Sequence, residues 1–122
     1  MKICYLRNGE TRVAKVAIVG SRNFKALHLV RDLVASLPPD TIVLSGGASG
    51  VDKAAIEEAR LCCLQYSELP ARWDLFGKRA GMIRNQELYN LCDYAVCFWD
   101  DASPGTAWWI HKEKTRHVWS DL

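Results

Sequence analysis

Two glycine-bearing segments lie about sixty residues apart in the chain, and each one joins a predicted strand to a predicted helix. They comprise residues 45–50 and residues 103–106. The first amide groups of a helix lack intrahelical acceptors and carry partial positive charge, so anions bind there. Glycine also allows a close approach to the backbone. We therefore expect both segments to bind phosphate groups of one ligand; ordinary tight turns are the alternative.

Apolar runs alternate with segments of helical periodicity from residue 13 onward. Strands are predicted at residues 13–20, 41–45, 64–69, 94–99 and 117–119, and helices at 24–37, 51–62, 80–91 and 106–114. This alternation is typical of a Rossmann-like, doubly wound α/β fold, in which helices cover both faces of a mostly parallel five-stranded sheet. Ligands of such folds bind at the carboxyl ends of the strands, where both glycine segments fall.

The length of 122 residues predicts a single folded unit. We expect residues 13–122 to form the Rossmann-like domain and residues 1–12 to be an N-terminal extension. Asn8-Gly9 lies between two β-prone segments and indicates a hairpin turn, so an extra N-terminal strand is predicted.

Composition excludes several classes of protein. With 49% hydrophobic and 25% charged residues, and no apolar run of the roughly 18 residues that a membrane span needs, a cytoplasmic location is expected. Residues 1–10 contain no secretory signal pattern. The five cysteines show no CxxC spacing, so neither a metal site nor a disulfide framework is predicted. The net charge of only +2 makes nucleic acid an unlikely partner.

Loops after several predicted strands contribute the candidate ligand-binding residues. Arg22 follows the first strand of the domain and could clamp a phosphate with its guanidinium fork. Asp52 could accept a ribose hydroxyl, although an acidic residue is also common at a helix start. Trp73 is the aromatic residue we select for stacking on a base. The whole predicted set is Gly20, Ser21, Arg22, Gly46, Gly47, Ala48, Ser49, Gly50, Asp52, Trp73, Arg84, Asn85, Ser103, Gly105 and Thr106.

Five short motifs resemble those of a known superfamily. They are VAIVGSRNF at 16–24, LSGGASGVDKAA at 44–55, PARWD at 70–74, GKRAG at 77–81 followed by Arg84-Asn85, and FWD at 98–100 followed by Ser103 and Gly105-Thr106. The chain resembles the SLOG superfamily over about residues 13–119, and its YspA-like branch in particular. The superfamily groups DNA-processing protein A with the Lonely Guy phosphoribohydrolases. The resemblance implies a Rossmann-like fold and a nucleotide-derived ligand.

The resemblance leaves catalysis open. In Lonely Guy enzymes an arginine that matches Arg84 is thought to act beside a glutamate three places after the threonine, and here that place is Trp109. Cleavage of an N-glycosidic bond needs a carboxylate. Asp100 and Asp101 are the candidate replacements, with a solvated acidic turn as the alternative.

Three functions follow as hypotheses. The first is a protein that senses or sequesters a nucleotide-derived ligand, such as ADP-ribose, an NAD-like compound or a nucleoside monophosphate, with no further cofactor. The second is a hydrolase that cleaves an N-glycosidic or phosphoester bond. The third is single-strand DNA binding like that of DNA-processing protein A. Trp108 and Trp109 are adjacent on one predicted helix, so one of them could mark a homodimer surface.

Overall fold

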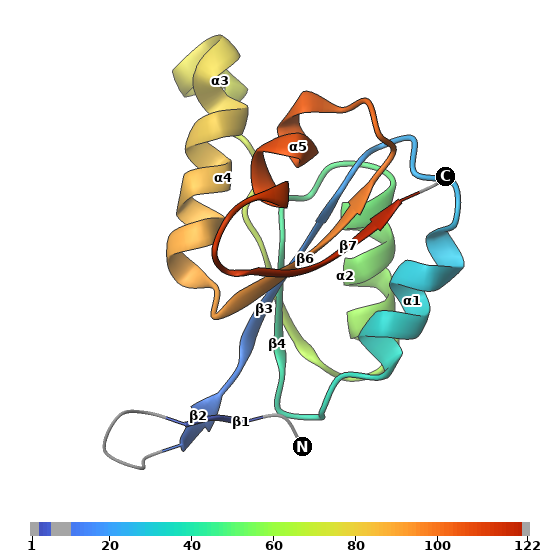
Figure 1. Ribbon diagram of the computed structural model, residues 1–122. Coiled ribbons are helices and arrows are strands. Elements are labelled where there is room, and N and C mark those ends of the chain that lie inside the picture. Colours follow the sequence, from blue (N-terminus) through green and yellow to red (C-terminus); the bar gives the residue numbers. More distant parts are fainter. Residues whose placement is uncertain (1–2, 6–10, 121–122) are drawn as a thin grey trace.

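The computed structural model describes residues 3–5 and 11–120, and its centre is a twisted, all-parallel sheet of five strands (Figure 1). Across the sheet the strand order is β5-β4-β3-β6-β7. The strands are β3 (Lys15–Gly20), β4 (Ile42–Ser45), β5 (Gln65–Glu68), β6 (Tyr94–Trp99) and β7 (Thr115–Ser120). Every neighbouring pair is parallel. The predicted doubly wound α/β fold is confirmed.

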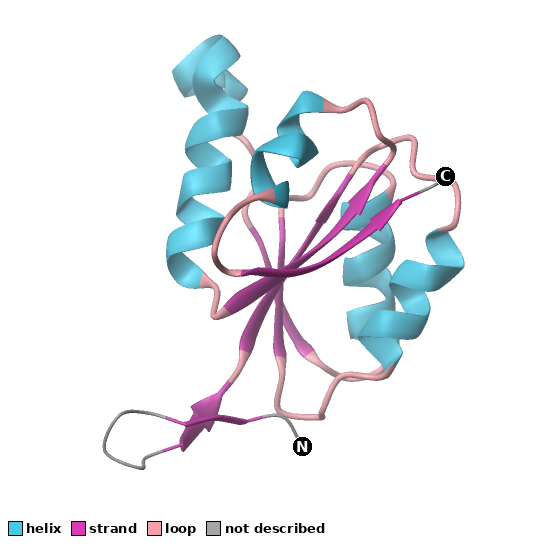
Figure 2. Ribbon diagram, viewed as in Figure 1, coloured by secondary structure: helices cyan, strands magenta, loops and turns pink. Residues whose placement is uncertain are grey.

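Helices cover both faces of this sheet, as Figure 2 shows. The helices α1 (Leu27–Ala35) and α2 (Val51–Leu61) pack on one face, and α4 (Ala80–Leu91) and α5 (Pro104–Ile110) pack on the other. Successive side chains of β3 point to opposite faces, so Val16 and Ile18 join the first core while Ala17 and Val19 join the second. Burial on both faces explains the continuous apolar runs in β3 and β6.

Several element boundaries differ from the predicted ones by one or two residues, and two helices differ by more. The helix α1 begins at Leu27 rather than residue 24, because the Phe24 amide closes a turn by donating to the Ser21 carbonyl oxygen, 3.3 Å away. The helix α5 begins at Pro104, whose fixed φ suits a first helical position, and it ends at Ile110 rather than residue 114.

Two short elements between β5 and α4 were not predicted. They are α3 (Trp73–Phe76) and the 3-10 helix η1 (Gly77–Arg79). Neither is long enough to show a helical repeat of apolar residues. Gly77, the first residue of η1, has a φ of +56° and ends α3, while Trp73, Leu75 and Phe76 are all exposed.

Near the N-terminus, β1 (Ile3–Tyr5) and β2 (Thr11–Val13) pair antiparallel in a separate two-stranded sheet that projects from the amino ends of the main strands (Figure 1). The predicted turn at Asn8-Gly9 lies outside the described residues. Within the described part of the chain, no helix is long and apolar enough to cross a lipid bilayer.

Candidate ligand-binding site

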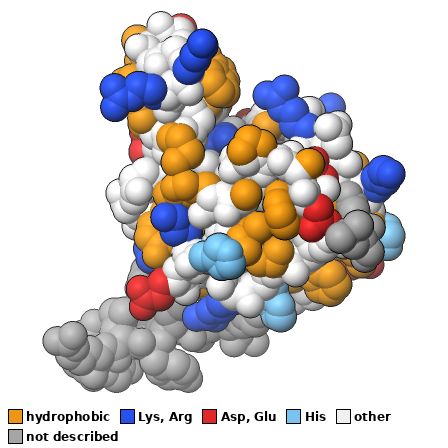
Figure 3. All heavy atoms as spheres, turned by 45° about the horizontal axis from the view of Figure 1, so that its top comes forward, with side chains coloured by type: hydrophobic (Ala, Val, Ile, Leu, Met, Phe, Trp, Pro, Cys, Tyr) orange, Lys and Arg blue, Asp and Glu red, His pale blue; other side chains and the backbone are white. Residues whose placement is uncertain are grey.

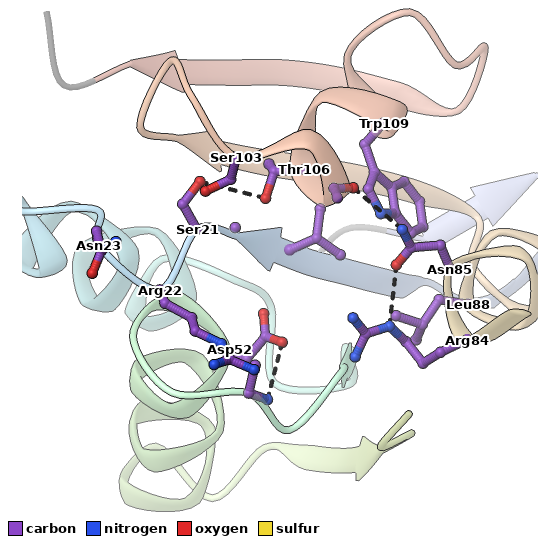
Figure 4. A pocket seen from close by; sticks show the side chains of 14 residues that line it. Ser21, Arg22, Asn23, Asp52, Arg84, Asn85, Leu88, Ser103, Thr106 and Trp109 are labelled. Atoms are coloured by element: carbon purple, nitrogen blue, oxygen red, sulfur yellow. Dashed lines mark hydrogen bonds between the residues drawn. The ribbon is translucent and has the colours of Figure 1, made fainter. Parts of the chain in front are cut away.

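A cavity of about 240 Å³ opens at the carboxyl ends of β3 and β6. The strand order reverses direction at β3, with β4 on one side and β6 on the other, and ligands of open α/β sheets bind at such a point. We call this space the inner cavity. It is lined by Val19, Gly20, Ser21, Arg22, Asn23, Ala48, Asp52, Arg84, Asn85, Leu88, Ser103, Gly105, Thr106 and Trp109. Figure 4 shows the polar side chains converging on it from the loop after β3 and from α2, α4 and α5.

Asp52 is the acidic residue in this lining, and it is 4% exposed. Its Oδ2 accepts a hydrogen bond from the Ala48 amide at 3.2 Å, whereas its Oδ1 is buried without a hydrogen-bond partner among the described residues. Burial raises the pKa of Asp52 to about 6, although the positive charge of Arg84 and hydrogen bonding from the Ala48 amide, the Ser45 hydroxyl and the Gly20 amide oppose the shift. A buried carboxylate oxygen without a donor is costly, and a hydroxyl donor that reached it would relieve that cost.

Arg84 connects α4 to the glycine segment after β4. Its Nη1 donates to the Gly46 carbonyl oxygen at 3.0 Å, and its Nε donates to Asn85 Oδ1 at 3.1 Å. Asn85 in turn donates through Nδ2 to the Gly105 carbonyl oxygen at 3.2 Å. This chain of hydrogen bonds ties the two predicted phosphate segments together and fixes the orientation of the guanidinium group.

Hydroxyl groups form the opposite wall of the inner cavity. Ser21 Oγ lies 3.4 Å from Thr106 Oγ1, and both residues are buried. The Asp100 amide donates to Ser21 Oγ at 3.1 Å, which places the loop after β3 against the end of β6. Asn85, Ser21 and Thr106 therefore offer neutral polar groups to a ligand, while Arg22 and Arg84 offer charged donors.

Close backbone approach is needed at two of the predicted glycines. A Cβ on Gly20 would lie 2.6 Å from the Phe98 carbonyl oxygen, and one on Gly50 would lie 2.5 Å from the Arg22 carbonyl oxygen. Gly50 also has a φ of +78°. In both cases the neighbouring atom belongs to the protein backbone, so these glycines allow the loops around the site to pack closely against each other.

A second hollow, also of about 240 Å³, lies beside the inner cavity, and we call it the outer cavity. Arg22, Ala48 and Arg84 line both spaces. The remaining lining of the outer cavity is Gly46, Gly47, Pro70, Ala71 and Trp73. Gly46, Gly47 and Ala48 of the first glycine segment and Trp73 are thus brought next to the second segment.

Four predicted residues line neither of these cavities: Ser49, Gly50, Asp100 and Asp101. The Asp100 carboxylate faces the start of α5, where Oδ1 accepts from the amides of Ala102 and Ser103 at 3.0 and 2.8 Å and Oδ2 accepts from Ser103 Oγ at 2.9 Å. These bonds lower the pKa of Asp100 to about 2. Asp101 has a φ of +66° and accepts a hydrogen bond from Ser120 Oγ. Asp100 itself thus occupies the amide and the hydroxyl of Ser103, which belongs to the second predicted phosphate segment.

Sequence reasoning missed Asn23, Leu88 and the lining role of Trp109. Trp109 is 1% exposed, with its ring 5.2 Å from that of Trp108 and 6.0 Å from that of Tyr89. Trp108 is half-buried and lies under the Lys112 ammonium, 4.2 Å from the ring centroid. The position of Trp109 directly after Trp108 on a short helix was the available signal, because only one of the two can face the sheet.

The lining of the site combines positive, negative and neutral polar groups. Within residues 3–5 and 11–120, no group of three or more His, Cys, Asp and Glu side chains is placed to hold a metal ion. Two arginines, a buried carboxylate and several hydroxyl and amide groups surround the space instead.

These features define a Rossmann-like α/β domain with a polar cavity at its switch point. The structure is similar to that of DNA processing protein A (DprA) from Streptococcus pneumoniae, with a TM-score of 0.64 and 18% sequence identity over 89% of this chain. The chain spans 59% of the length of that protein chain. No protein-family model and no curated protein matches the sequence. The comparison therefore establishes a DprA-like fold.

Proposed function

We propose that this chain is a member of the YspA-like branch of the SLOG superfamily that senses or sequesters a nucleotide-derived ligand in the inner cavity. ADP-ribose, NAD-like compounds and nucleoside monophosphates are the ligands we favour. The observation that carries the proposal is the unpartnered, buried Oδ1 of Asp52 in a cavity that two arginines also line.

The mixture of charges selects this ligand class. Arg22 and Arg84 present guanidinium groups, which bind phosphate with good geometry. Asp52 would repel a bare phosphate, but as a carboxylate it accepts hydrogen bonds from sugar hydroxyls. A ligand that carries both a phosphate and a ribose satisfies both kinds of group. Inorganic phosphate satisfies only the arginines.

The test is calorimetric titration of the purified protein with AMP, NAD and ADP-ribose, followed by chromatography of each mixture. We expect at least one intact nucleotide to bind, and Arg22→Gln to weaken that binding by about tenfold or more. Arg31→Gln is the matched control, because Arg31 lies on α1 and pairs with Glu57 at 3.6 Å rather than lining the cavity. Absence of binding by all three compounds would refute the proposal. Conversion of a ligand to free base or free phosphate would replace it with the hydrolase hypothesis.

Single-strand DNA binding is the second candidate, and the DprA-like fold is the observation that favours it. The charge distribution favours it less. The Lys and Arg side chains form separate areas rather than one stripe on the face seen in Figure 3, and the net charge is +2. Fluorescence anisotropy with a labelled single-stranded oligonucleotide at low and high salt tests this second candidate. Tight binding with a steep salt dependence would favour DNA.

A further inference from the structure

The volumes of the two cavities indicate the size of the ligand that the site can hold. Each one has about 240 Å³, which is below the roughly 300–1,000 Å³ of typical small-molecule sites, whereas the two side by side come within that range. The residues that line both spaces are Arg22, Ala48 and Arg84. A ligand that fills the site therefore passes the two arginines at its middle.

Of the two spaces, the outer cavity offers an accessible aromatic face. Trp73 is 56% exposed and lines the outer cavity, and its Cη2 lies 3.5 Å from where a Cβ on Gly81 would stand. The ring thus rests close to the backbone of α4 and leaves much of its surface to solvent. Trp109, in the inner cavity, is 1% exposed and surrounded by other rings. Stacking on a base is consequently available at Trp73 and not at Trp109.

The inner cavity, by contrast, offers a carboxylate. Asp52 lines it together with the hydroxyls of Ser21 and Thr106, and Asp52 is absent from the outer lining. Hydroxyl recognition and base stacking are in this way separated, with the arginines between them.

We propose that the ligand is a nucleoside diphosphate sugar that spans both cavities. Its base stacks on Trp73, its phosphates lie between Arg22 and Arg84, and the hydroxyls of its distal sugar donate to Asp52. This proposal rests on the proposed function, and it names which part of such a ligand each cavity takes.

Three probes separate these contributions: ribose 5-phosphate, which lacks a base; ADP, which lacks a distal sugar; and ADP-ribose, which has both. We expect ADP-ribose to bind most tightly. Trp73→Ala should weaken the binding of ADP and of ADP-ribose by about tenfold or more and leave the affinity for ribose 5-phosphate unchanged. Asp52→Asn should weaken the binding of ADP-ribose and of ribose 5-phosphate and leave the affinity for ADP unchanged.

Leu75→Ala is the matched control for Trp73, since Leu75 lies on the same short helix, is 61% exposed and lines neither cavity. Thermal melting of each variant checks that it folds. If Trp73→Ala leaves the affinity for ADP unchanged, or ADP-ribose binds no tighter than ADP, the spanning arrangement is wrong and the proposed function stands. If none of the three probes binds the wild-type protein, the spanning arrangement is wrong, and the proposed function fails as well if AMP and NAD also do not bind.

Discussion

The guanidinium of Arg84 occupies the space that a side chain at residue 46 would need. Nη1 donates to the Gly46 carbonyl oxygen at 3.0 Å, and a Cβ on Gly46 would lie 2.1 Å from the same nitrogen. The glycine of the segment after β4 is thus required by a protein side chain. The arginine held in this way lines both cavities.

Gly46→Ala should displace Arg84 and weaken ADP-ribose binding by about tenfold, because the hydrogen bond that orients the guanidinium is lost. Calorimetric titration measures this. If the effect acts through Arg84, then Gly46→Ala combined with Arg84→Ala should bind no more weakly than Arg84→Ala alone. Additive losses would show that Gly46 contributes independently of the arginine.

Asp52→Asn should stabilise the unliganded protein at neutral pH. The folded-state pKa of Asp52 is raised from 3.8 to about 6, so its contribution to stability is fully present below about pH 4 and is lost as the pH rises through about 6. The full loss is about 3 kcal/mol for a shift of roughly two units. Urea denaturation from pH 4 to 8 should therefore show that the free energy of unfolding of the variant, relative to that of the wild type, rises by about 1–3 kcal/mol. Equal stability of the two proteins at both ends of this pH range would contradict a buried Asp52 carboxyl with a raised pKa.

Asp100→Asn should lower stability by about 1 kcal/mol with little effect on ligand affinity, because the Asp100 carboxylate holds the turn that precedes α5 by three hydrogen bonds and lies outside the cavity lining. The depressed pKa of Asp100 gives the opposite pH dependence to that of Asp52. Its contribution is present above about pH 4 and is lost as the pH falls toward about 2. Thermal melting and titration with ADP-ribose measure both effects. Loss of binding or turnover in a variant of unchanged stability would instead support the catalytic role that the sequence suggested.

Gly105→Val should reduce affinity without unfolding the protein. Gly105 lines the inner cavity, and its φ is not in the left-handed region. Apart from its chain neighbours and the backbone of its own helix, no described atom lies within 4 Å of where a Cβ on Gly105 would stand. The added side chain should therefore narrow the cavity at modest cost to stability. Full affinity in a folded Gly105→Val variant would exclude close contact of the ligand with this part of the site.

Gly47→Val is a poorer probe of the other glycine segment. The φ of +76° at Gly47 strains any branched residue, so a loss of affinity there would be mixed with a loss of stability.

The fold was predictable because its three central strands, β3, β4 and β6, are largely buried. A strand such as β6, with the sequence YAVCFW, reads as an uninterrupted apolar run between polar turns, and such runs define the alternation of strands and helices. The element α3 was not predictable, since four residues with exposed apolar side chains carry no periodic signal.

The location of the inner cavity was also predictable, because parallel strands place their carboxyl ends at one edge of the sheet. The direction of individual side chains was not. Asp100 and Asp101 follow β6 as expected, yet the carboxylate of Asp100 bonds to the turn that precedes α5, and Asp101 takes a left-handed conformation that directs it to Ser120. Both outcomes depend on where the following loop runs, which the spacing of residues does not specify. The reading of these two residues as catalytic stays a prediction.

Titration of the wild-type protein and of Arg84→Gln with ADP-ribose at pH 7.5 tests the phosphate site directly. We expect saturable binding by the wild type with one ligand for each chain, and a loss of about tenfold or more in the variant. Absence of binding by the wild type, or equal affinity of the two proteins, would contradict a phosphate site built around Arg84.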